Sequence, residues 1–343
     1  MANYNTSLGK EAPQTLNRPQ TLNKPQALNG SQALHQFRGA YTDLRDLIRL
    51  RYAAREVGDL TDNRISNPLA GLLTSRFQGR GIDFAEVRVY QPGDDVRTID
   101  WRVTARTQVP HTKLFQEEKE RPVFILADQS ASMYFGSQIT FKSVLAARAA
   151  ALIAWFALER GDRVGGLVFS EMGHSEVRPR RNRHAVLRLL NELHEFNHAL
   201  KLESATADPA YSDNYFTEAL AQVRRVARHG SVIFILSDFT NYGPESRLHL
   251  QPLARNNDVV GIHISDPLEH TLPSPDIYNI TNGMQHTRIN TASGKHRDAF
   301  EARFKDERRR IEEEFLRVKS PIISLATSDS LVAGLNQAKA GIV

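Results

Sequence analysis

Oxygen-bearing side chains stand at alternate positions directly after a short apolar run. Asp128, Ser130 and Ser132 offer one carboxylate and two hydroxyls, and the run before them, residues 123–127, is typical of a strand buried on both faces. Mg²⁺ prefers an octahedron of oxygen ligands, keeps several waters and is commonly held by one or two carboxylates. The segment therefore predicts one edge of a divalent-cation site.

A second apolar run ends in the same manner, because residues 232–236 lead into Ser237 and Asp238. Carboxylates from two strand ends, with hydroxyls beside them, meet the demands of a hard cation and leave one coordination position for a carboxylate from outside. Helix capping by each serine and aspartate is the alternative interpretation. Capping explains each residue separately but not their matched positions after two strands.

The elements that must position these residues alternate between apolar runs and helical patterns. This alternation predicts an α/β fold with a doubly wound, mostly parallel sheet, in which ligands bind beyond the carboxyl ends of the strands. The predicted strands cover residues 123–127, 164–169, 232–236, 259–264 and 322–326, and the predicted helices cover about residues 141–159, 184–196, 215–228, 245–254, 295–318 and 329–338.

The chain before this domain has a different character. The apolar spacing of residues 40–54 predicts an N-terminal helix, and residues 83–90, 96–105 and 112–118 predict strands of a small antiparallel unit. The N-terminal segment repeats a six-residue pattern that begins PQTLNR and contains few apolar groups, so we expect disorder there. The predicted units are a repeat tail (1–36), an N-terminal helix with a small β-rich insert (37–121) and an α/β domain (122–343).

The strand-end pattern resembles that of a von Willebrand factor type A (vWA-like) domain, whose adhesion site has the form Asp-x-Ser-x-Ser, then a threonine, then an aspartate. Thr217 takes the place of the threonine, although Phe216 stands where the family has a glycine. The resemblance implies a Rossmann-like sheet and a metal-ion-dependent adhesion site (MIDAS) for Mg²⁺, or for Mn²⁺ or Ca²⁺. The implied ligands are Asp128, Ser130, Ser132, Thr217 and Asp238.

An upstream string is similar to the signature of the domain-of-unknown-function-58 family. It reads GRGIDF at residues 79–84, RVYQPGDDVRTIDW at residues 88–101 and TAR at residues 104–106. The resemblance runs from about residue 40 to the end of the chain. It implies a type A domain with a β-rich insert before it, and partnership with a MoxR-type AAA+ ATPase. Many relatives carry transmembrane helices ahead of the signature, and no apolar run of that length precedes it here.

The signature can also be interpreted from its residues alone. Pro92 and Gly93 predict a turn, and the charges around it are spaced to form Arg–carboxylate pairs that fasten the insert to the sheet. These charges are Asp94, Asp95 and Asp100 with Arg88, Arg97, Arg102 and Arg106. Trp101 is expected to pack in the core because of the large area that an indole buries. A surface that faces a partner is the alternative.

Composition narrows the class of protein. The 343 residues include no cysteine, which excludes disulfides, thiolate metal sites and cysteine nucleophiles. No apolar run is long enough to span a bilayer and the N-terminus lacks the pattern of a secretory signal, so we expect a cytoplasmic protein. The net charge of +5 decides little between partners.

Two other classes of function stay open. A metal-dependent hydrolase would use the same strand-end carboxylates, but an aspartyl nucleophile of the phosphotransferase kind needs an aspartate where Ser130 stands, and no P-loop motif occurs. His194 and His198 have helical metal spacing, yet no glutamate completes a zinc protease motif, so we expect surface histidines. Nucleic-acid binding needs aromatic platforms on a basic face, whereas the aromatic residues here fall mainly within apolar runs. We therefore expect a binding module and not an enzyme: an adaptor of a MoxR-type AAA+ ATPase that binds an acidic residue of a client protein.

Overall fold

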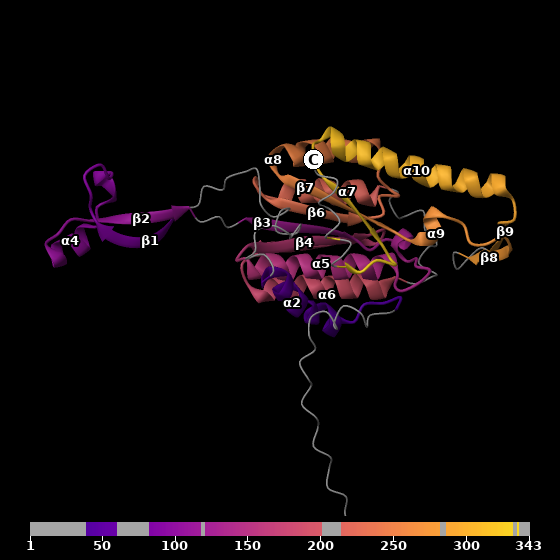
Figure 1. Ribbon diagram of the computed structural model, residues 1–343, viewed down its shortest axis with the longest axis horizontal. Coiled ribbons are helices and arrows are strands. Elements are labelled where there is room, and N and C mark those ends of the chain that lie inside the picture. The colour runs from indigo at the N-terminus through magenta and orange to yellow at the C-terminus, as the bar shows by residue number, and fades with distance from the viewer. Residues whose placement is uncertain are drawn as a thin grey trace, which may run out of the picture.

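The computed structural model describes residues 39–59, 82–117, 121–200, 214–281, 286–331 and 335. The expected repeat tail and most of the expected last helix lie outside these residues. Within them, a six-stranded sheet forms the centre of the main body (Figure 1), in the order β10-β7-β6-β3-β4-β5. The strands are β3 (Pro122–Asp128), β4 (Arg163–Ser170), β5 (Gly173–Arg180), β6 (Val232–Ser237), β7 (Asp258–Ser265) and β10 (Ile322–Ala326).

The sheet is parallel apart from β5, which pairs antiparallel with β4 at one edge. The central strands are apolar along nearly their whole length because helices cover both of their faces. The predicted α/β fold with a mostly parallel sheet is therefore confirmed. The sequence pattern did not predict β5, nor the small hairpin of β8 (Ile277–Thr281) and β9 (His286–Asn290).

Helices cover the sheet on both sides (Figure 1). One layer contains α2 (Leu44–Asp59), α5 (Lys142–Glu159) and α6 (Arg183–Ala199), and the other contains α7 (Tyr215–Val226), α8 (Pro244–Asn256) and α10 (Gly294–Arg317). Helix α5 is apolar nearly all round because α2 and α6 cover the side that the sheet leaves free. Trp155 of α5 donates from Nε1 to the carbonyl of Leu47 in α2, 3.1 Å away, so the N-terminal helix is part of the core.

Two glycines allow helices to approach the sheet closely. A Cβ on Gly166 of β4 would lie 2.9 Å from Cδ1 of Leu189 in α6, and a Cβ on Gly261 of β7 would lie 2.7 Å from Cε1 of Phe315 in α10. The absence of a side chain at Gly261 thus lets the last turns of α10 lie close against the middle of β7.

The signature segment forms an arm that projects from one end of the body (Figure 1). Strands β1 (Ile82–Val89) and β2 (His111–Glu117) pair antiparallel, and between them lie the 3-10 turn η1 (Val96–Thr98) and the short helix α4 (Trp101–Thr107). The prediction of a strand over residues 96–105 is wrong. The carboxylate of Asp95 accepts from the backbone N–H of Arg97, and that of Asp100 accepts from two backbone N–H groups, so the aspartates turn the chain into η1 and α4.

Two expectations about the signature residues are also corrected. The side chain of Trp101 is 71% exposed instead of packed in the core. Arg88 pairs with Asp94 at 2.7 Å inside the arm itself, so this ion pair shapes the tip and does not fasten the arm to the sheet. The physical reason is that the carboxylates of the arm accept hydrogen bonds from nearby backbone N–H groups and from Arg88, so they are engaged within the arm and not with the sheet.

Candidate functional site

Asp128 and Ser237 end two neighbouring parallel strands. Ala127 and Leu236 are paired in register, so the next residues of β3 and β6 emerge side by side at the carboxyl edge of the sheet. The hydroxyl of Ser237 donates to Oδ2 of Asp128 at 2.5 Å, and the backbone N–H of Ser130 donates to Oδ1 at 2.9 Å. The carboxylate of Asp128 is therefore buried and held by hydrogen bonds on both of its oxygens.

Asp238 meets a lysine that sequence reasoning did not find. Nζ of Lys142, the first residue of α5, lies 2.8 Å from Oδ2 of Asp238 and 2.5 Å from Oε1 of Glu269. Glu269 belongs to the short helix α9 (Pro267–His270). The backbone N–H of Thr240 donates to the other oxygen of Asp238 at 3.0 Å. Spacing in the sequence contained no signal for this group, since its members come from three separate elements.

The two serines of the first motif join the carboxylates. The hydroxyl oxygens of Ser130 and Ser132 lie 3.2 Å apart, and the nearby Ser132 helps to lower the pKa of Asp238. Between them the backbone N–H of Ala131 donates to Oε1 of Glu171 at 2.7 Å, which fixes the turn. The structure thus brings four of the five predicted ligands together at one edge of the sheet.

Thr217 is the predicted ligand that, among the described residues, forms no hydrogen bond with this group. Its hydroxyl lies 2.8 Å from that of Ser246 in α8. The residue of α7 whose electrostatics involve the first motif is Tyr215: Asp128 and Ser130 both influence the pKa of its hydroxyl, and this hydroxyl accepts from Nδ2 of Asn241. Burial raises the pKa of Tyr215 above its usual range, so this hydroxyl stays protonated. A role for Thr217 as a ligand would need its hydroxyl to leave Ser246.

Gln129, the residue between the aspartate and the first serine, is fully buried. Its amide nitrogen donates to the carbonyl of Ser143 at 2.9 Å, and its amide oxygen accepts from Asn197 at 3.2 Å. The side-chain oxygen of Asn197 in turn accepts from the backbone N–H of Thr42 at 2.7 Å. This chain of amides ties the motif to α5, to α6 and to the segment before α2, and it makes Gln129 a positioning residue.

The two strand-end carboxylates have opposite electrostatic surroundings. Burial, and then the nearby charge of Asp238, raise the pKa of Asp128 to about 7. Burial is also the largest influence on Asp238, but the charge and hydrogen bond of Lys142, together with the backbone N–H of Thr240, outweigh it and hold the pKa of Asp238 below its usual range. Within the described residues, Asp238 has a cationic partner in Lys142 and Asp128 has none. An additional cation beside Asp128 would relieve the repulsion between the two carboxylates.

The donors present suit a hard cation. Two carboxylates and two serine hydroxyls are oxygen ligands of the kind that Mg²⁺ takes, and its shell is commonly completed by water. In the described part of the chain, no group of three or more His, Asp or Glu side chains is arranged to hold a metal ion. A cation at this edge would therefore depend on the serine hydroxyls as well as on Asp128 and Asp238.

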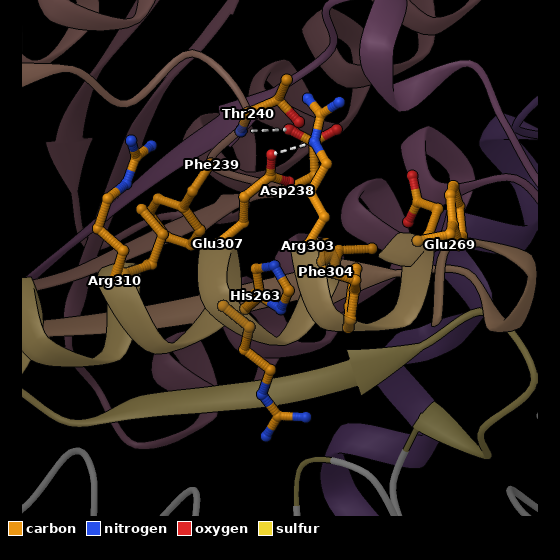
Figure 2. Close-up of a pocket in the computed structure, with 13 residues that line it drawn as sticks. Asp238, Phe239, Thr240, His263, Glu269, Arg303, Phe304, Glu307 and Arg310 are labelled. Atoms are coloured by element: carbon orange, nitrogen blue, oxygen red, sulfur yellow. Dashed lines mark hydrogen bonds and ion pairs between the residues drawn. The ribbon is translucent and has the colours of Figure 1, made fainter. Parts of the chain in front are cut away.

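A pocket of about 360 Å³ adjoins Asp238 on the side of α10. Figure 2 shows Glu307 and Arg303 of α10 reaching toward Asp238 and Thr240, with Nε of Arg303 bonded to Glu307 at 2.9 Å. His263 lines the same pocket. Burial lowers its pKa to about 4, and within the described residues its Nδ1 has no hydrogen-bond partner. His263 is therefore a neutral, stacked side chain beside Phe239.

Phe239 follows Asp238 with a positive φ of 56°, an uncommon conformation for a residue other than glycine. Its backbone N–H donates to the hydroxyl of Ser237 at 2.9 Å, and its side chain is buried. Backbone strain of this kind persists only where the surrounding packing enforces it, and it is frequent at functional sites.

His194 and His198 do not form a metal pair. Nδ1 of His194 lies 3.2 Å from the hydroxyl of Thr42, and Nε2 of His198 lies 2.7 Å from the carbonyl of Thr42. Both rings therefore hold the segment before α2 against α6.

The family model described as "Protein of unknown function DUF58" matches residues 86–310, which is well over half of the chain. The chain belongs to the DUF58 family. The match includes most of the arm, both strand ends that carry the candidate site and the first two thirds of α10. The resemblance of the upstream signature to this family is thereby confirmed.

Relatives of this DUF58 chain include proteins described as uncharacterized from Mycobacterium bovis and from two strains of Mycobacterium tuberculosis. Each is 31% identical over 226 residues, which cover 66% of this chain and 68% of the relative. None of the described helices is long and apolar enough to cross a membrane.

Two solved structures are similar to part of the chain. BatB from Bacteroides thetaiotaomicron has 14% sequence identity and a TM-score of 0.37, and the match covers 65% of this chain and 98% of that one. The pilus adhesin SpaC from Lactobacillus rhamnosus GG has 14% identity and a TM-score of 0.32, over 66% and 31% of the two chains. Because both TM-scores are below 0.5, the description of the fold is based on the strand order of the sheet and not on these two structures.

Proposed function

We propose that this DUF58 chain is a protein-interaction module of the vWA-like kind, in which a divalent cation, Mg²⁺ first of all, is held by Asp128, Ser130, Ser132 and Asp238. When bound, the cation would supply a Lewis-acidic position for a carboxylate of a client protein. The proposed partners are a MoxR-type AAA+ ATPase and a client that presents an acidic residue.

One observation carries the proposal: the two buried carboxylates converge at adjacent strand ends, and among the described residues Lys142 pairs with Asp238 whereas no ion pair is formed by Asp128. Two like charges this close destabilise each other unless a proton or a cation intervenes. The serine hydroxyls face the same point, and Ser237 orients Asp128 by donating to its Oδ2. The group offers two carboxylates and two serine hydroxyls as oxygen ligands, which is the donor set that a hard cation takes.

Lys142 has a defined part in this proposal. Its ammonium compensates Asp238 and Glu269, so one of the two strand-end carboxylates is already balanced. Lys142 contacts Oδ2 of Asp238, and Ser132 of the first motif lies near the same carboxylate. The lysine would thus hold Asp238 in place for a cation that Asp128 and the serines bind.

The proposal is tested with purified protein and a MoxR-type ATPase from the same organism. Complex formation is measured by analytical ultracentrifugation with Mg²⁺, with EDTA, and with Asp128→Asn in Mg²⁺. We expect complex only with wild type in Mg²⁺. Thermal unfolding measured with and without Mg²⁺ gives a separate readout of cation binding.

The matched control is Asp276→Asn, which replaces an exposed carboxylate far along the chain from both strand ends. It should bind as wild type does. A complex that survives both EDTA and Asp128→Asn would show that the association does not use a cation at this site. Equal thermal stability with and without Mg²⁺ would show that the site binds no cation.

A further inference from the structure

The tip of the arm, residues 90–110, exposes several apolar side chains within one short segment. Trp101 is 71% exposed, Val96 is 61% exposed and Val109 is 43% exposed. The other tryptophan of the chain, Trp155, is 2% exposed in the core. Exposed apolar groups gathered on a projecting element mark an interaction surface.

The carboxylates of the tip are all used by the tip itself. Asp94 accepts from the guanidinium of Arg88 at 2.7 Å and from the backbone N–H of Gln91 at 2.9 Å. Asp95 caps η1, and Asp100 caps α4. These acidic side chains thus shape the backbone around the indole of Trp101.

The arginines of the tip are in the opposite situation. Arg97, Arg102 and Arg106 are exposed, and within the described residues none of their guanidinium groups makes an ion pair. Arg102 and Arg106 are four residues apart in α4, so they lie on the same side of the helix, next to the stripe that Trp101 begins. The tip therefore combines an exposed indole with unpaired positive charge.

We propose that this tip is a docking surface for a protein partner that presents carboxylates around an apolar recess. The recess would receive the indole of Trp101, and the carboxylates would pair with Arg102 and Arg106, since a guanidinium binds a carboxylate through two parallel hydrogen bonds. Tryptophan and arginine are the residues most enriched among those that dominate binding energy at protein interfaces.

The charges of the tip favour a protein over a polyanion. Residues 88–106 contain four arginines and three aspartates interspersed along the chain. A nucleic-acid backbone or an anionic lipid surface presents continuous negative charge, which would meet the aspartates as well as the arginines. A protein surface presents its carboxylates singly and can match the arginines alone.

This surface is separate from the proposed cation site. It contains none of the strand-end residues, and the pairing of arginine with carboxylate needs no metal. Docking through the arm should therefore persist in EDTA and in the Asp128→Asn protein, so either proposal can fail without the other.

The experiment places the photoreactive residue p-benzoylphenylalanine at position 101 of the full chain, expressed in its native host, and maps the cross-linked peptides. We expect a segment of another protein that carries acidic residues beside apolar ones. A synthetic peptide of that segment, labelled for fluorescence anisotropy, then serves as the probe for purified variants.

Arg102→Glu together with Arg106→Glu should weaken peptide binding by on the order of 30-fold, the effect expected when central interface residues are lost. Exchange of the carboxylates of the peptide for lysines should restore binding to this variant. Trp101→Ala should weaken binding similarly, whereas Leu316→Ala, which changes an equally exposed residue of α10 (75%), should not. Unchanged thermal unfolding of all three variants shows that the body still folds.

Four results would overturn the proposal. The first is that the charge exchange does not restore binding, and the second is that EDTA abolishes peptide binding. The third is that no cross-link forms, or that the cross-links go to nucleic acid, to lipid or to a second copy of this chain. The fourth is a shift in the emission of Trp101 on addition of phosphatidylglycerol vesicles or duplex DNA, which would assign the tip to a polyanion. Because Trp155 is buried in the core, a change in tryptophan emission of the unmodified chain on addition of vesicles or DNA is assigned to Trp101.

Discussion

Nζ of Lys142 lies 2.8 Å from Oδ2 of Asp238 in the core of the protein, where the lysine side chain is 2% exposed. The same nitrogen contacts Glu269, so one ammonium pairs with two carboxylates, whereas Asp128 forms no ion pair with any described residue. This distribution of charge is the basis of the predictions on cation binding that follow.

Replacement of the buried lysine should make the protein depend on a divalent cation. Lys142→Met leaves Asp238 and Glu269 without their counterion, and loss of one partner of a buried ion pair costs about 3–5 kcal/mol. We expect a large fall in thermal stability in EDTA and a larger rise on addition of Mg²⁺ than in wild type. Lys305→Met, which removes an exposed pair with Glu301, is the control and should cost less than about 1 kcal/mol. Equal stabilisation by Mg²⁺ in both variants would contradict the prediction.

The metal-free protein should lose stability as the pH rises through neutrality. The pKa of Asp128 is about 7 in the folded chain, against 3.8 for an unperturbed aspartate. Because the folded pKa is raised, the contribution of the protonated carboxyl is complete below pH 4 and is lost as the pH passes about 7. Thermal unfolding is measured in EDTA at values between about pH 5 and pH 8. The stability should fall with rising pH in wild type but not in Asp128→Asn. A parallel decline in both proteins would mean that another group titrates.

Thr217→Val separates two roles for the threonine. The structure pairs its hydroxyl with Ser246, so we expect a loss of about 1 kcal/mol of folding stability and an unchanged affinity for Mg²⁺. Isothermal titration with Mg²⁺ and denaturant unfolding measure the two quantities. A weaker Mg²⁺ affinity with unchanged stability would make Thr217 a ligand, as the resemblance to the adhesion-site pattern implies.

Acid should destabilise the fold through His263. Burial lowers its pKa to about 4 from the usual 6.5, so the unfolded chain takes up the proton first. A depressed pKa contributes stability that is complete above pH 6.5 and is lost as the pH falls through about 4, by about 3 kcal/mol in total. Denaturant unfolding at pH 4.5 and at pH 7 should show a smaller difference for His263→Phe than for wild type, and His296→Phe, with an exposed ring, should behave as wild type. The same pH dependence in His263→Phe would assign the effect to other groups.

The pattern of apolar residues along the sequence predicted much of the fold. The apolar runs that end at Asp128 and Asp238 predicted buried strands because a strand covered on both faces has no polar side chains to alternate. The helices between them followed from their own periodicity. The signature of the arm indicated the family, which the match over residues 86–310 confirmed. The cation ligands and the partners stay predictions.

The arm shows where pattern failed. The alternation over residues 96–105 resembled a strand, yet Asp95 and Asp100 accept hydrogen bonds from the backbone close after them and turn the chain into η1 and α4. Trp101 was expected in the core because of its size, but no element of the described part of the chain covers it on the arm, so it is exposed. Local hydrogen bonds and the lack of a covering element decided both outcomes.

By itself, the sequence determined that Asp128 and Asp238 follow buried strands and that Ser130 and Ser132 lie beside the first of them. Only the tertiary structure decided which residues surround these carboxylates, because contacts between distant elements depend on the strand order and on helix packing. It brought Lys142 and Glu269 to Asp238, it directed the hydroxyl of Thr217 toward Ser246, and it left Asp128 without a cation. Spacing along a chain fixes neighbours within one element, whereas charge balance in a buried site is set by elements that meet only when the sheet has formed.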